Sequence, residues 1–272
     1  MERQADRENL SAMQDAAITQ LAESPEHYAR YLEVQGDNPL YSAGNVILAM
    51  TQNPEITKFG TKEKWKLQGR SVSDAERHKG VQIFSRGTFG KGFVVTEVYD
   101  ISQTYGREPK GVHLQNGTAE IGQALAVLMN YSVVPVKSNE EMEPPAFYDE
   151  HSMELYVNPA YSDTEAFAAI ATEVAHSRFH AKGVNQFYSR AECNIDAQSV
   201  AYLLCRRFGV ECDLPELSGL SEAYRDWTPQ EVRQALDGIQ DMSKKIGGSI
   251  EQAITPQQHT RNAPQKRSSY AR

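Results

Sequence analysis

The residues best suited to chemistry lie in the stretch ATEVAHSRFH, which runs from Ala171 to His180. In the pattern H-E-x-x-H, two histidines on one helix face bind a metal ion and the glutamate acts as general base. Here Thr172 stands in place of the first histidine, while Glu173 and His176 keep the other two positions. His180 follows one turn later on the same face. The stretch therefore retains the base and one ligand of such a metal site.

Two interpretations of this stretch remain open. In the first, a displaced zinc site forms from nitrogen and oxygen ligands on two helices, with Glu173 catalytic only if that site is active. Its ligands would be His176, His180, Glu192 and Asp196. In the second, Glu173 and His176 form a buried polar group with Asn194 and Asp196, and no cofactor is bound. We favour the second, because threonine and asparagine are poor zinc ligands.

The helices that carry these residues are predicted from their end signals. The first follows Ser162 or Asp163 and ends by Gly183, and the second runs from about Tyr188 to Phe208, before Gly209. Thr118 caps an earlier helix, and VVPV and MELYV have the composition of short strands. The sequence therefore predicts a mostly helical unit with a short sheet, over residues 113–215.

The first part of the chain has a different pattern. Residues 9–34 predict one or two amphipathic helices, Ser42 begins another, and Thr61 caps one or two helical turns. The runs VQIFSRG and GFVVTEVYD, joined through glycines, predict a β-hairpin. We therefore expect an α+β protein in which a small helix-plus-hairpin domain, residues 1–112, precedes the mostly helical one.

Charge is distributed unevenly along the chain. The net charge is −8, yet residues 53–110 hold 11 Lys and Arg against 7 Asp and Glu. Cations interleaved with aromatic side chains are what single-stranded DNA binding requires. The predicted DNA-binding residues are Lys58, Phe59, Lys62, Lys64, Trp65, Lys66, Arg70, Lys79, Arg86 and Lys91. The alternative is that Phe59 and Trp65 belong to the core and the lysines form a solvated face.

Two stretches of the chain resemble known families. The ordered motifs YSAGNVILAM, ITKFGTKEKWKLQGRSV, VQIFSRG and VVTEVYDISQTYG, within residues 8–110, resemble the N-terminal domain of ArdC-like antirestriction proteins. That resemblance implies single-stranded DNA binding in a mobile genetic element. A strand pair, a T-E-x-x-H helix and a second long helix, within residues 117–213, resemble the zincin core of ImmA/IrrE-like metallopeptidases. Asn194 falls where that family has a ligand glutamate, so this second resemblance implies a degenerate site.

The C-terminal part adds helices and a tail. Residues 216–254 are predicted to be helical, and Thr228, Pro229 and Glu231 give a clear helix start. The apolar stripe of the 229–246 helix either packs on the preceding unit or docks a protein partner, and we expect Gly247 and Gly248 to end the helix. The basic tail, residues 255–272, is predicted to be disordered.

Composition narrows the class of protein. No apolar run is long enough for a membrane span, and the N-terminus lacks a secretory signal, so we expect a cytoplasmic protein. Cys193, Cys205 and Cys212 contain no C-x-x-C pair, which agrees with a reducing compartment. Three functions remain: single-stranded DNA binding with an inactive metallopeptidase-like domain, a zinc metallopeptidase that cleaves a regulatory protein, or a non-catalytic protein-interaction module.

Overall fold

The structure, a computed structural model, describes residues 2–87, 92–181 and 188–255 and has an α+β fold, as predicted. The helices are α1 (Glu2–Glu23), α2 (Pro25–Asp37), α3 (Ala43–Gln52), α4 (Lys62–Leu67), α5 (Ala119–Tyr131), α6 (Asp163–Ala181), α7 (Arg190–Phe208), α8 (Leu220–Ala223) and α9 (Pro229–Ile254). The strands are β1 (Phe59–Gly60), β2 (Arg70–Val72), β3 (Val81–Arg86), β4 (Phe93–Asp100), β5 (Thr104–Gly106), β6 (Val136–Ser138), β7 (Ala146–Asp149) and β8 (Glu154–Val157).

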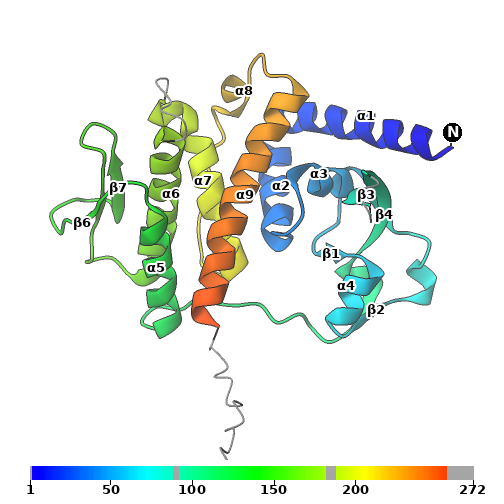
Figure 1. The fold of residues 1–272 in the computed structure, drawn as a ribbon, viewed down its shortest axis with the longest axis horizontal. Helices are drawn as coiled ribbons and strands as arrows, with labels where there is room; N and C mark the ends of the chain where they lie inside the picture. Colours follow the sequence, from blue (N-terminus) through cyan, green and yellow to red (C-terminus); the bar gives the residue numbers. More distant parts are fainter. Residues whose placement is uncertain (1, 88–91, 182–187, 256–272) are drawn as a thin grey trace, which may run out of the picture.

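The long helix α9 lies at the centre of the molecule. It packs against α5 and α7 on one side and against α1 and α3 on the other (Figure 1). One buried hydrophobic cluster runs from Leu10 to Ile250 and includes residues of all these helices. Polar links add to the packing of α2 on α7: the Tyr28 and Ser199 hydroxyls are 3.1 Å apart, and Arg206 pairs with Asp37 at 3.0 Å. The two predicted domains thus share a continuous core, and the boundary at residue 112 stays a prediction.

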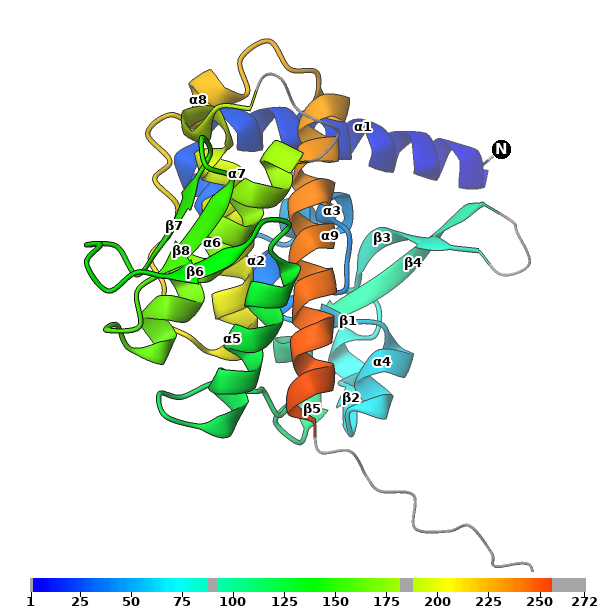
Figure 2. The same ribbon diagram turned by 60° about the vertical axis from the view of Figure 1, so that its left-hand side comes forward.

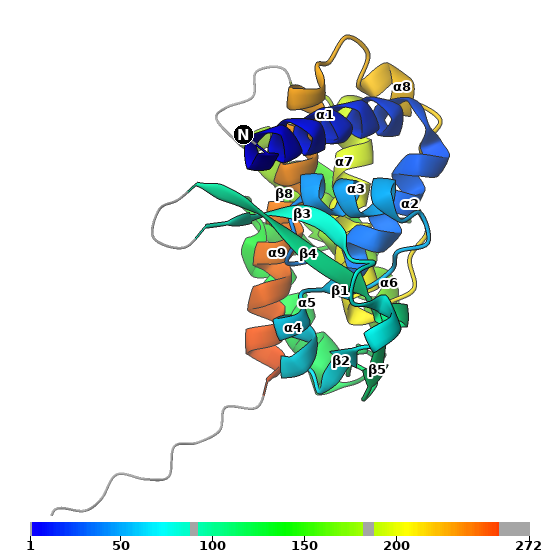
Figure 3. The ribbon, with the colours of Figure 1, turned by 90° about the vertical axis from the view of Figure 1, so that its right-hand side faces the viewer.

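The N-terminal elements follow their local signals. Side-chain oxygens of Ser24 and Thr61 accept backbone N–H groups at the starts of α2 and α4, as their positions predict. The predicted hairpin is β3 paired with β4, and β1 extends it on the far side of β4. In Figure 2 it extends away from the central helix α9, on the same side as α1. The ribbon of β2 and β5 was not predicted, and it lies with α4 at the end of the molecule away from α1 (Figure 3).

A second sheet covers one side of α6. Its strand order is β6-β8-β7, with β6 parallel and β7 antiparallel to the central β8. The strand predicted from VVPV begins only at Val136, and β7 was not predicted at all. Both β7 and β8 contact α6. This sheet therefore brings Tyr148, on β7, to the helix that carries Glu173.

One prediction about α9 needs correction, and the structure decides between the two alternatives for its apolar stripe. The helix does not end at Gly247 and Gly248 but continues to Ile254. A side chain at Gly247 would meet Arg207 at 2.4 Å, so this glycine serves close packing on α7. The apolar stripe of the helix is buried in the core, which excludes it as a docking surface for a protein partner. The tail from residue 256 onwards lies outside the described residues.

Membrane insertion through a helix is not supported. Among residues 2–87, 92–181 and 188–255, every helix is too short or too polar to span a lipid bilayer.

Candidate functional site

The chemistry-bearing residues of α6 meet α7 and β7 in one polar cluster inside the C-terminal part. Helix α6 buries nearly its whole circumference, with Phe167, Ile170 and Val174 inaccessible to solvent. Such burial leaves little room for an unpaired polar group. Each polar side chain of this segment therefore needs a hydrogen-bond or ion-pair partner. Those partners determine whether the side chain is free to act as a base or as a metal ligand.

Glu173 is held by two partners. Its Oε2 accepts the backbone N–H of Tyr148 at 2.7 Å, and its Oε1 forms an ion pair with Arg190, the first residue of α7. Burial raises the pKa of the Glu173 carboxyl, although the Arg190 guanidinium and the Tyr148 N–H oppose that rise. A general base needs a free oxygen within reach of the proton it removes. Both oxygens of Glu173 are already occupied, so it is not placed as a free base.

His176 lies one turn along α6 and is fully buried. Its Nδ1 is 3.0 Å from the Tyr188 hydroxyl, while its Nε2 has no hydrogen-bond partner among the described residues. Burial lowers the pKa of His176 to about 4, and the positive charge of Arg190 acts in the same direction. The imidazole is therefore neutral at neutral pH.

His180 belongs to the same cluster but has different partners. Its Nδ1 is 2.6 Å from the Tyr148 hydroxyl, and its ring stacks on that of Tyr188 with centroids 4.5 Å apart. Tyr148 and Tyr188 thus connect His176 and His180 through hydroxyl and ring contacts. The predicted pair of helical imidazoles exists, but both rings are engaged with tyrosines.

The two predicted acidic ligands lie elsewhere on α7. Glu192 is exposed in the first turn, and Asp196 accepts a hydrogen bond of 2.8 Å from the Tyr224 hydroxyl. Burial raises the pKa of Asp196 to about 6. Among the described residues, no three His, Cys, Asp or Glu side chains are placed to hold a metal ion. The structure therefore does not bring His176, His180, Glu192 and Asp196 together as one metal site, and the sequence-based prediction missed Arg190 and Tyr188.

The burial of His176 predicts a pH-dependent contribution to stability. The unfolded histidine takes up a proton below about pH 6.5, whereas the folded one stays neutral down to about pH 4. Its stabilising contribution is therefore complete above that window and declines by roughly 3 kcal/mol as the pH falls through it. Replacing His176 by glutamine should make unfolding free energies, measured in urea, less steep between these pH values. Replacing the exposed His151 should leave the slope unchanged, and an equal slope for both variants would contradict this account.

The predicted DNA-binding residues divide into buried and exposed groups. Phe59, Trp65 and Arg70 are buried, and this corrects their predicted contact with DNA. The Trp65 indole donates a hydrogen bond of 2.8 Å to the Tyr99 carbonyl, and Arg70 donates to the Arg107 carbonyl at 2.8 Å. Trp65 thus links α4 to β4, Arg70 links β2 to β5, and Phe59 packs against the Tyr41 ring. The alternative of a core role is confirmed for both aromatic residues.

Lys58 and Lys64 are partly buried. The Lys64 ammonium lies 4.4 Å from the centre of the Tyr41 ring and donates to the Phe59 carbonyl at 3.1 Å. Burial lowers the pKa of Lys64 to about 8, with the charge of Lys58 adding to the effect. Lys64 is thus engaged in holding α4 against β1 and is a weak candidate for phosphate contact.

The remaining described cations are exposed. Lys62 and Lys66 are four residues apart on α4, so they share one face of it. Arg86 is exposed at the outer end of β3, while Lys79 forms an ion pair with Glu76 at 2.8 Å. Lys91 lies outside the described residues.

Two exposed aromatic residues accompany these cations. Phe93 is 62% exposed and is the direct cross-strand partner of Arg86, and Tyr105 on β5 is 64% exposed. The sequence-based prediction missed both. No alternation along β4 marks Phe93, because burial increases from the start of the strand to its end. The exposure of Tyr105 depends on the unpredicted pairing of β5 with β2. We call Arg86 and Phe93 the hairpin end, and Lys62, Lys66 and Tyr105 the α4–β5 face.

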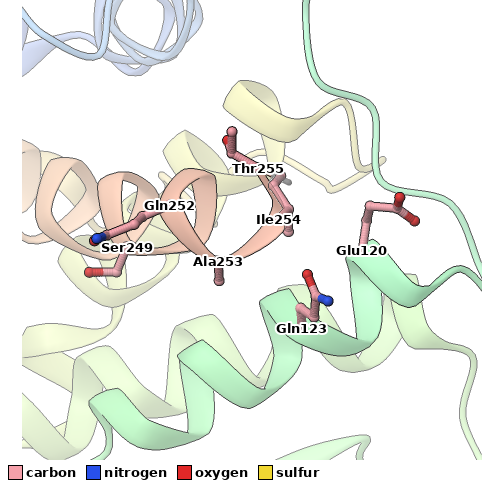
Figure 4. Close-up of a pocket in the computed structure, with 7 residues that line it drawn as sticks. All are labelled: Glu120, Gln123, Ser249, Gln252, Ala253, Ile254 and Thr255. Carbon is pink, nitrogen blue, oxygen red and sulfur yellow. The ribbon is translucent and has the colours of Figure 1, made fainter. Parts of the chain in front are cut away.

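A separate hollow of about 600 Å³ lies between α5 and the end of α9 (Figure 4). Its lining residues are Glu120, Gln123, Ser249, Gln252, Ala253, Ile254 and Thr255. Glu120 is the single ionisable side chain among them, and Figure 4 shows it at the edge of the group. A lone carboxylate beside amides and hydroxyls offers no acid and base pair, so this hollow is not a candidate catalytic site.

Comparison with solved structures shows that the chain has the fold of an antirestriction protein. Two of the matching structures are of the antirestriction protein ArdC from plasmid R388. Its metal-free form aligns over 89% of this chain and 97% of its own, with a TM-score of 0.56 and 14% identity. The Mn(II)-bound form aligns over 90% of this chain and 99% of its own, with a TM-score of 0.54 and 15% identity. No protein-family model matches the sequence, and no curated protein matches it.

Because one of these ArdC structures holds Mn(II), the cluster on α6 must be tested for its fit to a metal ion. The unpartnered Nε2 of His176 is one possible donor. Thr172, where a second ligand would stand, donates its hydroxyl to the Ala168 carbonyl at 3.1 Å. The Arg190 guanidinium already neutralises Glu173 and would repel a cation. These residues do not fit a divalent metal centre.

Proposed function

We propose that this chain is a single-stranded-DNA-binding protein of the ArdC antirestriction type, active in the transfer or defence of mobile DNA. The observation that carries the proposal is the similarity of nearly the whole chain to the R388 antirestriction protein. The exposed cations and aromatic rings of the α4–β5 face and the hairpin end support it. Cations neutralise phosphates, and bases stack on aromatic rings.

We further propose that the part around α6 and α7 is a metallopeptidase-like core, related to the ImmA/IrrE type, that no longer catalyses hydrolysis. In support, the T-E-x-x-H helix packs along a second long helix and beside a small sheet. Glu173, which stands at the position of the base, is paired with Arg190. Thr172 and Asn194, which are poor metal ligands, stand at two of the ligand positions. This core then serves as the scaffold on which the DNA-binding elements rest. Metal analysis after purification without chelator tests this: about one zinc or manganese per chain would favour the peptidase alternative.

The aromatic residues provide the most specific test of DNA contact. Replacing Tyr105 by alanine should weaken binding of a fluorescein-labelled oligothymidylate by about 1–3 kcal/mol, because one stacking partner is lost. Phe93→Ala is expected to act in the same direction, by an amount within that range. Fluorescence anisotropy measures both affinities. Leu67→Ala, at an exposed aliphatic position on α4, is the control and should leave the affinity nearly unchanged. Equal affinities for all four proteins would contradict base stacking at these positions.

A further inference from the structure

Two cysteines, Cys205 and Cys212, line one hollow where the chain turns back at the end of α7. Gly209 adopts a left-handed conformation with φ of 63°, and the Val210 N–H donates to the Cys205 carbonyl at 2.9 Å. Six residues further on, the Glu216 N–H donates to the Gln198 side chain at 3.0 Å. The segment between these two bonds therefore runs back along α7. Cys212 lies in that segment, so the reversal returns it to the helix that carries Cys205.

The two thiols line the same hollow but differ in burial. Cys205 is 1% exposed, whereas Cys212 is only partly buried. The Cys212 Sγ donates to its neighbour's carbonyl, that of Asp213, at 3.4 Å. Interaction with the Cys212 sulfur, together with burial, raises the pKa of Cys205, and interaction with the Cys205 thiol lowers the pKa of Cys212. Both side chains line one hollow of about 370 Å³ beside Arg206. An accessible sulfur that favours the thiolate, next to a buried protonated thiol, is the arrangement found in redox-sensitive cysteine pairs.

We propose that Cys212 and Cys205 form a redox-sensitive dithiol site that a small peroxide converts to an intramolecular disulfide. The Cys212 thiolate attacks one peroxide oxygen, so that an S–O bond forms, the O–O bond breaks, and the released hydroxide takes up a proton as water. The Cys205 sulfur then attacks the sulfenic sulfur. The S–S bond forms as the S–O bond breaks, and the hydroxyl leaves with the Cys205 proton as a second water. Two thiols are oxidised and one peroxide is reduced.

This site is independent of the DNA-binding function proposed above. A disulfide would tie the segment that leads to α8 and α9 to the end of α7. The site is formed by α7 and the segment that follows it, and none of the residues that line it belongs to the α4–β5 face. Oxidation is therefore expected to form the Cys205–Cys212 disulfide and to leave the affinity for DNA nearly unchanged.

The test is peroxide treatment of the folded, reduced, full-length protein, followed by alkylation of the remaining thiols under denaturing conditions and mass spectrometry. The expected product is monomeric, has lost two hydrogen atoms, and is alkylated at Cys193 alone. Peptide mapping should find Cys205 joined to Cys212, and dithiothreitol should restore three alkylated cysteines. Cys193→Ser should still form the disulfide, whereas Cys212→Ser should not.

Cys205→Ala supplies the second diagnostic variant, because it keeps the reactive sulfur and removes its partner. Its Cys212 should form a sulfenic acid that dimedone traps, and no disulfide should appear. Three wild-type results would overturn the proposal. These are over-oxidation of Cys212 with Cys205 still alkylated, a disulfide that includes Cys193 or a second chain, and a disulfide that forms only in urea.

Discussion

Replacing Arg190 by methionine is expected to lower the free energy of unfolding by about 3 kcal/mol near neutral pH, measured by urea denaturation. The reason is that Glu173, whose side chain is 7% exposed, would keep its charge in the core without a counter-charge. Arg190 itself is 35% exposed, which places the expected loss at the low end for a broken buried ion pair. The loss of stability arises mainly from the buried, unpaired Glu173 carboxylate and not only from the missing contact with Arg190.

Two further variants separate these causes. Glu173→Gln combined with Arg190→Met removes both charges, so the double variant should be more stable than Arg190→Met alone. Arg225→Met breaks an exposed ion pair with Glu222 and should cost less than about 1 kcal/mol. If Arg190→Met were as stable as Arg225→Met, the pairing of Glu173 with Arg190 would not hold the cluster together.

The effect of Arg190→Met should also depend on pH. A buried carboxyl whose folded-state pKa is raised contributes stability at low pH, and this contribution is lost as the pH rises through that pKa. Without the Arg190 guanidinium, the pKa of Glu173 in the folded protein rises further. The loss of unfolding free energy in Arg190→Met should therefore be smaller at about pH 5 than at about pH 7.5.

The second large effect is expected on DNA affinity. Converting Lys62 and Lys66 together to glutamate should weaken binding to single-stranded DNA about tenfold or more at moderate salt, because two phosphate contacts become repulsive. The plot of log affinity against log salt should become shallower by about 1.4 for the two lost contacts. Anisotropy titrations at several salt concentrations measure both quantities.

The control for this experiment is Lys245→Glu, an exposed charge reversal on α9 outside the α4–β5 face. Its affinity and salt slope should remain close to those of the wild type. If the α4 double variant and Lys245→Glu weaken DNA binding equally, the loss of affinity is a general effect of charge. The proposed α4–β5 face would then be wrong.

The local signals in the sequence were sufficient for most helices. Ser24, Thr61 and Thr118 each cap the helix they precede, and Gly209 ends α7 in a left-handed conformation. These signals act within one helical turn, so they can be interpreted without tertiary structure. The end of α9 could not be predicted in this way. Gly247 does not end the helix but lies inside it, where it packs closely against Arg207 on α7.

The candidate sites were predictable only in part. The H-E-x-x-H pattern identified Glu173 and His176 by their positions. The partner of Glu173 is Arg190, 17 residues further along the chain. A search for metal ligands considers only acids and histidines, so it does not find an arginine. The burial of Trp65 depends on the carbonyl of Tyr99 on a distant strand. Tyr105 is exposed because β5 pairs with β2, which precedes it by more than 30 residues. Contacts of this range come from the fold and not from local spacing.

The most direct test of the account is binding of the intact wild-type protein to a labelled single-stranded oligonucleotide and to its duplex, with EDTA present throughout. The account predicts tighter binding to the single strand, weakening with salt, and no change when EDTA is replaced by Mn²⁺ or Zn²⁺. A protein that binds neither form of DNA, that prefers the duplex, or that binds only with added metal would contradict it.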